Sequence, residues 1–329
     1  MKENFRDRVF DVKDGPGFTS LSIELFNYQY ANNPVYRSFV DYLGKDPGSV
    51  KELVEIPFMP VEFFRDHTVI TGEIRVEMIF ESSGTAGMIT AKHFITDLRV
   101  YEESFLRGFR SFYGDPGRYI IAALLPSYTE RAGSSLVYMA DRLIKETGHK
   151  LSGFYKEDIT DFIRKARNWR NRGRKAMIIG VSFALLDLAE SSGPDLKGFT
   201  VMETGGMKGR RREITREELH SALTSKLRLK AVHSEYGMTE LLSQAYSKGK
   251  GLFRCPPWMK IILRDPQDPL SMIREPGKTG GINVIDLANI NSCSFIATSD
   301  LGRISADGSF EVLGRFDNSD IRGCNLMVE

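Results

Sequence analysis

The sequence has little cysteine, no excess of either charge and no long hydrophobic run. Cysteine occurs three times in 329 residues, as Cys255, Cys293 and Cys324, and none of the spacings is typical of metal ligands. An odd, widely spaced set argues against a disulfide framework and favours a reducing compartment. Lysine and arginine (45) nearly balance aspartate and glutamate (43), so the formal charge of +2 demands neither nucleic acid nor an anionic membrane as a partner.

Signals for export and membrane insertion are also missing. Residues 1–18 contain no apolar core of the kind that a secretory signal needs. The longest apolar stretches, near residues 119–126 and 176–188, are too short or too interrupted to span a bilayer. We therefore expect a cytoplasmic protein. Its 329 residues, 41% of them hydrophobic, are enough for one large domain with a small satellite.

Strand-like and helix-like segments alternate over the first 250 residues. Short apolar runs predict strands at residues 76–80, 119–125, 176–179, 199–203 and 229–233. Helical spacing predicts helices at residues 21–43, 97–112, 135–147, from about 183, and 216–227, with an extended loop at 56–64. This alternation indicates an α/β domain, residues 1–250, with a mostly parallel sheet and flanking helices.

The pattern changes after about residue 251. Short β-like runs at residues 259–263, 281–286, 294–298 and 310–312 are separated by turn residues, and no long helix is predicted between them. Residues 251–329 are therefore expected to form a small β-rich subdomain.

A run of glycine and hydroxyl residues, ESSGTAG at residues 81–87, follows the first predicted strand. Glycines let the backbone approach a phosphate, and successive N–H groups with Ser and Thr hydroxyls satisfy its oxygens. The segment is not a Walker A loop, because no Gly-Lys-Ser/Thr follows at the required spacing. Taken alone, a tight turn explains it equally well.

A second segment, GVSFA at residues 180–184, nearly matches the nucleophile elbow of a serine hydrolase. His220 or His233 could serve Ser182 as a base. However, Ala184 replaces the last glycine, and no glycine-rich oxyanion segment lies upstream. Ser182 is better explained as a helix cap or a pocket wall.

Three polar segments occur late in the chain: SEYGMTE at 234–240, TSDLGRI at 298–304 and GRFDNSDIRGCN at 314–325. Each alone is a polar turn, although a carboxylate after a strand can bind ribose hydroxyls or Mg²⁺, and an arginine can complete such a site. Together with residues 82–87, their order and spacing resemble the adenylate-forming superfamily of acyl-CoA synthetases and adenylation domains.

Four motifs carry this resemblance. Residues 82–87 resemble the phosphate loop of that superfamily, with Ala86 in place of a threonine, and residues 236–240 resemble its Y-G-x-T-E motif. Residues 299–302 resemble T-G-D-L-G, and residues 314–317 resemble G-R-x-D. The segments IPFMPVEFFRDH, LLPSYTERAGSSLVYM, METGGMKGRRREITREEL and DIRGCNLM resemble, more narrowly, the acyl-protein synthetase branch known from the fatty-acid reductase of bacterial luminescence. Phenylacetate–CoA ligases are the next-nearest relatives.

The resemblance implies a site for ATP and Mg²⁺. The residues that it assigns to ATP are Ser82, Ser83, Gly84, Thr85 and Gly87 at the triphosphate, Tyr236 and Gly237 at adenine, Gly205 and Gly206 at the adenine and acyl pocket, Thr239 at the α-phosphate, and Asp300 and Arg315 at the ribose. Glu240 would coordinate Mg²⁺. The residues implied to be catalytic are Thr85, Thr239, Glu240 and Cys324.

The resemblance also implies a departure at the C-terminus. Members of the superfamily continue into a mobile C-terminal domain with a catalytic lysine, and we expect that domain to be absent here. Cys324, which follows DIRG at the hinge position, is the implied acyl acceptor. An inert cysteine in a tail is the alternative.

The activity implied is ATP-dependent activation of a carboxylic acid, expected to be a long-chain fatty acid, as an acyl adenylate, followed by transfer to a thiol as a thioester. An acyl-accepting protein, a reductase or a carrier is the expected partner. Two alternatives stay open: an acyl- or aryl-CoA ligase on the same fold, and a non-catalytic nucleotide-binding subunit of a reductase or synthase complex.

Overall fold

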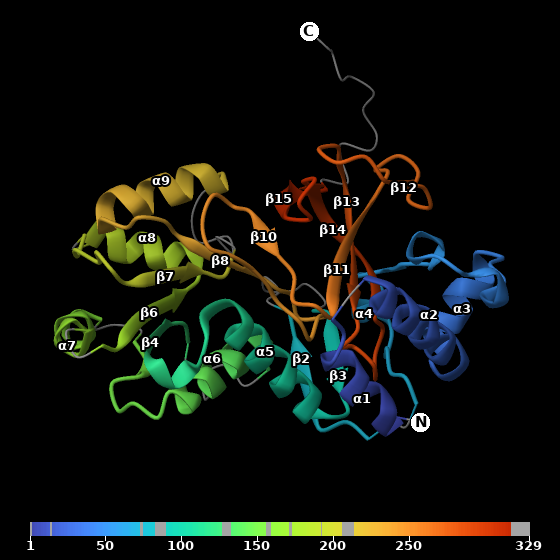
Figure 1. Ribbon diagram of the computed structural model, residues 1–329, viewed down its shortest axis with the longest axis horizontal. Helices are drawn as coiled ribbons and strands as arrows, with labels where there is room; N and C mark the ends of the chain where they lie inside the picture. Colours follow the sequence, from blue (N-terminus) through green and yellow to red (C-terminus); the bar gives the residue numbers. More distant parts are fainter. Residues whose placement is uncertain are drawn as a thin grey trace, which may run out of the picture. The chain divides into compact units, whose positions relative to one another are not determined.

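The computed structural model describes residues 2–13, 15–72, 75–82, 90–126, 133–155, 159–170, 173–191, 193–205 and 214–316. The chain divides into two compact units (Figure 1). Unit 1 comprises residues 1–63, 69–72 and 257–329, and unit 2 comprises residues 64–68 and 73–256. These units differ from the ranges 1–250 and 251–329 expected from sequence, because residues 1–63 group with the C-terminal segment.

Unit 2 contains a sheet that is parallel over most of its strands. Its strands are β4 (Tyr119–Leu124), β5 (Gly153–Phe154), β6 (Lys175–Gly180), β7 (Thr200–Glu203), β8 (His233–Tyr236), β9 (Ala245–Ser247) and β10 (Phe253–Arg254). They lie in the order β10-β9-β8-β7-β6-β4-β5. The pairs from β5 to β8 are parallel, whereas β9 joins β8 and β10 in antiparallel fashion. The α/β prediction is confirmed.

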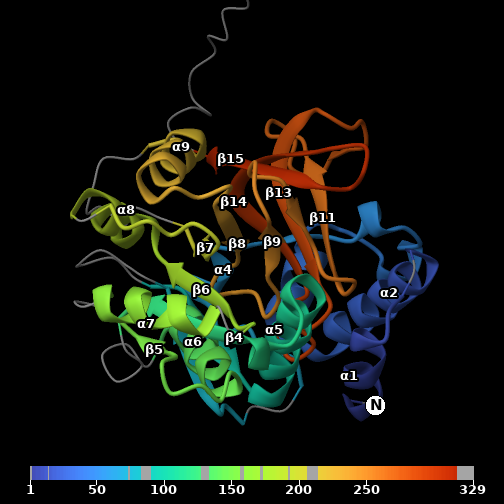
Figure 2. The same cartoon turned by 60° about the vertical axis from the view of Figure 1, so that its left-hand side comes forward.

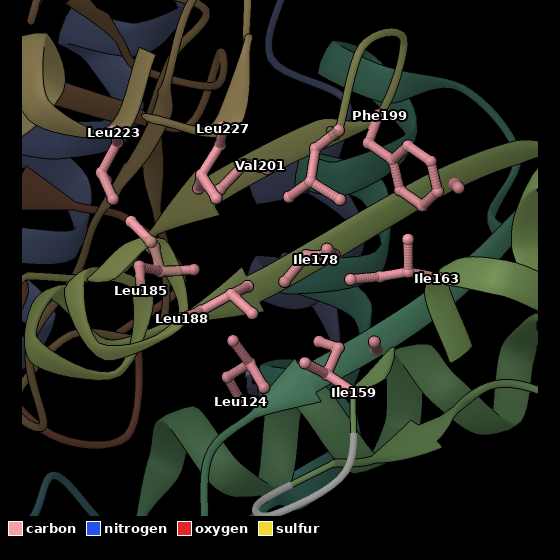
Figure 3. Close-up of a cluster of buried hydrophobic side chains, with 14 of the residues drawn as sticks. Leu124, Ile159, Ile163, Ile178, Leu185, Leu188, Phe199, Val201, Leu223 and Leu227 are labelled. Atoms are coloured by element: carbon pink, nitrogen blue, oxygen red, sulfur yellow. The ribbon is translucent and has the colours of Figure 1, made fainter. Parts of the chain in front are cut away.

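Helices cover both faces of this sheet. They are α5 (Leu98–Tyr113), α6 (Ser135–Glu146), α7 (Thr160–Arg170), α8 (Ser182–Ser191) and α9 (Arg216–Leu227). In Figures 1 and 2, α8 and α9 lie on one side of the strands, and α5 and α6 lie on the other. Figure 3 shows the core beneath α7, α8 and α9, where Ile178 and Val201 of the sheet meet Leu185 and Leu223. Burying this apolar surface is the main stabilising contribution to the unit.

Leu185→Ala is expected to destabilise unit 2 strongly. Leu185 is fully buried, and its side chain packs so closely on Gly180 that a Cβ there would lie 3.1 Å from Leu185 Cγ. Removing a buried leucine side chain costs about 2–5 kcal/mol, because transfer free energy is lost and a cavity is left. Urea unfolding measures this loss. Leu252→Ala, at a leucine that is 37% exposed, is the control. Equal midpoints for both variants would contradict the packing described here.

A separate hairpin in unit 2 carries the glycine-rich segment. Its strands, β2 (Met78–Glu81) and β3 (Lys92–Ile95), pair antiparallel, with Glu81 opposite Lys92. Residues 82–91 connect the two strands at the end where Glu81 pairs with Lys92, and residues 83–89 of this connection lie outside the described residues.

Unit 1 combines an antiparallel sheet with N-terminal helices. Its strands are β1 (Met59–Pro60), β11 (Met259–Arg264), β12 (Met272–Ile273), β13 (Thr279–Asp286), β14 (Phe295–Ile304) and β15 (Phe310–Arg315). The order is β12-β11-β13-β14-β15, with β1 parallel to β14. The helices of this unit include α1 (Lys2–Phe10), α2 (Gly15–Asn32) and α3 (Pro34–Tyr42). In both views α1 and α2 lie beside β11 (Figures 1 and 2), and Lys260 of β11 lies over the ring of Phe18.

Short elements complete the described structure. They are the 3₁₀ helices η1 (Pro47–Ser49), η2 (Leu53–Glu55) and η3 (Pro116–Arg118), and helix α4 (Phe63–Asp66). None of the described helices has the length and apolar character that a membrane span requires.

Two predictions of element boundaries were wrong for identifiable reasons. The single helix expected over residues 21–43 is broken at Asn33, whose side chain accepts from the Tyr36 N–H and caps α3, with Pro34 in its first turn. The strand expected at 229–233 is β8 instead, which starts at His233. Its residues HSEY are mostly polar, so they lack the apolar pattern of a buried strand.

Candidate active site

The predicted adenine-binding segments lie at the carboxyl ends of neighbouring strands in unit 2. Strands β7 and β8 are parallel, with Glu203 opposite Ser234. Gly205 follows the end of β7, and Tyr236 is the last residue of β8. This edge is where open α/β sheets generally bind ligands. Gly206 lies outside the described residues.

Contacts tie the glycine-rich hairpin to the same edge. The Glu81 N–H donates to the carbonyl of Gly133, which precedes α6 (2.7 Å). The Ser82 hydroxyl accepts from the Ala91 N–H (2.9 Å), and the Ser82 N–H donates to the Ala91 carbonyl (3.0 Å). Ser82 therefore closes the base of the segment. The predicted phosphate-binding residues beyond it, Ser83, Gly84, Thr85 and Gly87, lie outside the described residues.

His93 joins the hairpin to the Y-G-M-T-E segment, and sequence reasoning missed it. This side chain of β3 is 1% exposed, and its Nδ1 lies 2.9 Å from the carbonyl oxygen of Thr239. A single histidine on an alternating strand carries no sequence signal for such a contact. This contact holds strand β3 of the hairpin against the turn that follows β8.

The turn that follows β8 contains the predicted catalytic residues Thr239 and Glu240. The Leu241 N–H donates to the Met238 carbonyl (3.1 Å), which closes the chain around Thr239 and Glu240. Thr239 is partly exposed, and Glu240 is 7% exposed. Tyr236 is also 7% exposed, and its ring meets the ring of Phe253 at a centroid distance of 6.0 Å. Stacking of Tyr236 on adenine stays a prediction.

Two carboxyl groups at this edge, the buried Glu203 and the half-buried Glu235, have opposite pKa shifts. Burial would raise the pKa of Glu203, but His220, Arg216, Ser234 and the Gly205 N–H outweigh it and hold the pKa below its ordinary value. Burial, and then the negative charge of Glu203, raise the pKa of Glu235 to about 8. A pair of carboxyl groups with separated pKa values is typical of functional sites.

Glu235→Gln is expected to stabilise the protein in a pH-dependent way. A raised carboxyl pKa means that the folded state binds the proton more tightly than the unfolded state. The free energy of unfolding of the native protein therefore falls as pH rises from 4.5, the ordinary value, to about 8. Glutamine cannot ionise, so the variant escapes this loss, which is on the order of 3–5 kcal/mol at pH 8 and above.

Urea unfolding at pH 5, 7 and 9 measures the difference. The variant should gain stability over the native protein from pH 5 to pH 8 and keep a constant advantage above it. Glu217→Gln, at an exposed carboxylate of α9, is the matched control and should show no such gain. If the free energies of unfolding of Glu235→Gln and the native protein differ by the same amount at pH 5 and pH 9, the pKa of Glu235 is not raised.

The predicted ribose-binding residues face each other in unit 1. Asp300 of β14 is opposite Arg315 of β15, and the Arg315 Nε lies 3.6 Å from the Asp300 carboxylate. The Asp300 N–H donates to the Thr298 hydroxyl (3.1 Å), which fixes the backbone of the carboxylate. The Arg315 side chain is 83% exposed. The Asp300 carboxylate can accept hydrogen bonds from two vicinal hydroxyls, and the Arg315 guanidinium can donate hydrogen bonds to them.

Ser182 does not have the surroundings of a hydrolase nucleophile. Its buried hydroxyl donates to the Glu203 carboxylate (3.4 Å), at the start of α8. Neither histidine serves it, since His220 Nε2 lies 3.3 Å from the Ser234 hydroxyl and His233 Nδ1 lies 3.2 Å from the Tyr113 hydroxyl. Burial lowers the pKa of His233 to about 4.

The described cysteines are poor candidates for acyl transfer, and Cys324 lies outside the described residues. Cys293 is fully buried, and burial raises the pKa of its thiol to about 12. Cys255 is partly buried. No cluster of three or more His, Cys, Asp or Glu side chains among the described residues is placed to hold a metal ion.

No protein-family model and no curated protein sequence matches this chain. Solved structures do resemble it. A long-chain-fatty-acid–CoA ligase (FadD1) from Archaeoglobus fulgidus aligns with a TM-score of 0.54 and 15% identity, over 74% of this chain and 52% of that one. ATP-bound MatB from Rhodopseudomonas palustris aligns with a TM-score of 0.51 and 18% identity, over 73% and 48%.

A luciferase-like enzyme from the nonluminescent mealworm Zophobas morio aligns with a TM-score of 0.51 and 15% identity, over 83% of this chain and 62% of that one. The chain thus spans between 48% and 62% of the lengths of these three proteins. At such identities the likeness concerns the fold and not the chemistry. The chain shares the α/β fold of these three proteins.

Proposed function

We propose that this protein activates a carboxylic acid with ATP and transfers the acyl group to a thiol. The observation that carries the proposal is the convergence, within unit 2, of the glycine-rich hairpin, Gly205 and the Y-G-M-T-E turn at one edge of the sheet. The contacts Glu81–Gly133 and His93–Thr239 hold this arrangement. Its likeness in fold to an ATP-bound protein and to a fatty-acid–CoA ligase adds support.

The first step joins the acid to AMP. A carboxylate oxygen of the acid attacks the α-phosphorus of ATP, the bond to the β-phosphate oxygen breaks, and pyrophosphate leaves. We assign the triphosphate to the glycine-rich segment that begins at Ser82, and the α-phosphate to Thr239. Asp300 and Arg315 are assigned to the ribose hydroxyls. Backbone N–H groups and hydroxyls aimed at the developing charge would accelerate this step by electrostatic stabilisation.

Glu240 is the residue that we assign to Mg²⁺. It is a buried carboxylate directly after Thr239, and carboxylate oxygens suit this hard cation. One protein carboxylate together with phosphate oxygens and water is a common coordination for Mg²⁺ at nucleotides. The metal would neutralise charge on the leaving pyrophosphate.

The second step forms a thioester. A thiolate attacks the carbonyl carbon of the acyl adenylate, the bond to the phosphate oxygen breaks, and AMP leaves. The mixed anhydride is already reactive, so this step needs positioning and a deprotonated sulfur. We assign the acceptor to Cys324, and a thiol on a partner protein or carrier is the alternative acceptor. The acid is proposed to be a long-chain fatty acid.

Exchange of labelled pyrophosphate into ATP tests this proposal across a panel of fatty and aryl acids. Exchange that requires one of the acids supports adenylation. Thioester formation without CoA separates the acyl-protein synthetase from a CoA ligase, the second candidate, which the fold likeness to a fatty-acid–CoA ligase favours. Binding of ATP without exchange by any acid would instead indicate a non-catalytic nucleotide-binding subunit.

A further inference from the structure

A buried charged cluster lies directly behind the predicted adenine-binding residues. Its centre is Glu203, the last residue of β7, which is 2% exposed. One carboxylate oxygen accepts from the Gly205 N–H (2.8 Å) and the Ser182 hydroxyl (3.4 Å). The other oxygen faces Arg216 Nε (3.4 Å) and His220 Nε2 (3.7 Å), both on α9.

The hydrogen bond to Glu203 fixes the backbone N–H of Gly205, two residues after the end of β7. Gly205 has φ +76°, a left-handed conformation that glycine adopts without strain. The preceding residue is anchored as well, because the Thr204 N–H donates to the Gly180 carbonyl of β6 (3.1 Å). A buried carboxylate is costly unless it is paired, so Arg216 and His220 are what allow Glu203 to stay ionised there.

The same cluster reaches the second predicted adenine contact. The Arg216 guanidinium lies over the ring of Phe253, at 5.0 Å from its centroid, and that ring meets the ring of Tyr236. His220 Nε2 also lies 3.3 Å from the hydroxyl of Ser234, two residues before Tyr236. One cluster therefore supports both Gly205 and the end of β8.

We infer that Glu203, with Arg216 and His220, is a positioning cluster that sets Gly205 and Tyr236 for the purine of ATP. The cluster touches none of the reacting atoms and acts through the two loop positions. This inference rests on the proposed function, since it takes ATP to be the ligand of this edge.

Glu203→Gln, Arg216→Met and the double variant test the cluster, with Glu217→Gln on the same helix as the control. Titration calorimetry with ATP and Mg²⁺ is the first readout. Each single variant is expected to weaken ATP binding roughly tenfold, the size of one lost net hydrogen bond. The double variant should lose little more than either single one, because residues of one network are not additive. The control should bind as the native protein does.

Amide hydrogen exchange is the second readout, and it needs no ligand. The Gly205 N–H should exchange faster in Glu203→Ala than in the native protein, while the core amides of β6 keep their protection. Folded variants that bind ATP normally, or an unchanged Gly205 exchange rate, would overturn the inference. If Glu203→Gln does not fold, ATP binding is measured on Arg216→Met instead. This variant leaves the Glu203–Gly205 hydrogen bond in place and removes only the guanidinium.

ATP binding by the native protein and by the variants separates the two possible failures. A native protein that binds no ATP overturns the proposed function and, with it, the purine-positioning role. A native protein that binds ATP while the variants bind it equally well overturns the positioning role alone.

Discussion

Glu240→Gln is expected to slow pyrophosphate exchange on the order of 10²–10³-fold while changing ATP affinity far less. The carboxylate at position 240 is assigned to Mg²⁺, whose charge matters most as negative charge builds on the departing pyrophosphate. Glutamine keeps the size and one oxygen of the side chain but loses the charge. Exchange rates and ATP affinity, measured on the same preparation, separate the two effects.

Asp300→Ala is the matched comparison, because it removes a carboxylate assigned to the ribose and not to the metal. It should weaken ATP binding and affect turnover at saturating ATP less. The control Glu217→Gln should change neither quantity. Native exchange rates in both Glu240→Gln and Asp300→Ala would refute these residue assignments, even with the fold unchanged.

Cys324→Ser is expected to abolish covalent labelling of the protein by its acid substrate. With labelled acid and ATP but no CoA, the native protein should acquire label that neutral hydroxylamine removes, as it does from thioesters. The variant should acquire none and still exchange pyrophosphate, since adenylation does not use the thiol. The other cysteines are poor acceptors, because Cys293 is fully buried with a raised thiol pKa and Cys255 is partly buried.

Cys293→Ala and Cys255→Ser are the controls and should label like the native protein. Full labelling of Cys324→Ser would exclude that cysteine as the acceptor. Exchange without any labelling of the native protein would assign the acceptor to CoA or to a thiol on a partner, and adding CoA to the assay would separate these two.

The elements of the fold were predictable where burial produces a clear pattern. Strands β4 and β6 are continuous apolar runs because both of their faces are covered by helices, and α9 has a Thr215 capping box at its start. Strand β8 was misplaced because its residues HSEY are mostly polar, and β1 was missed because it has only two residues. The grouping of residues 1–63 with the C-terminal strands depends on long-range contacts, such as the Gln29 amide donating to the Asn289 carbonyl (2.8 Å), which no local pattern shows.

The candidate site was predictable only in part, for a similar reason. The resemblance to the adenylate-forming motifs indicated Tyr236, Glu240 and Asp300. The polar turn expected at Asp300 is instead part of β14, and only Glu240 lies in a turn after a strand. The resemblance did not indicate Glu203 or His93, whose partners lie far along the chain, Arg216 on α9 and the Thr239 carbonyl. Buried polar groups of this kind are defined by tertiary partners, which only the folded structure reveals.

Titration calorimetry of the native protein with ATP and Mg²⁺ tests the central claim most directly. Saturable binding with one ATP per chain is expected. Binding should also weaken when Asp300 is replaced by alanine and be unaffected by Glu217→Gln. Absence of any ATP binding by the folded native protein would contradict the adenylation account as a whole.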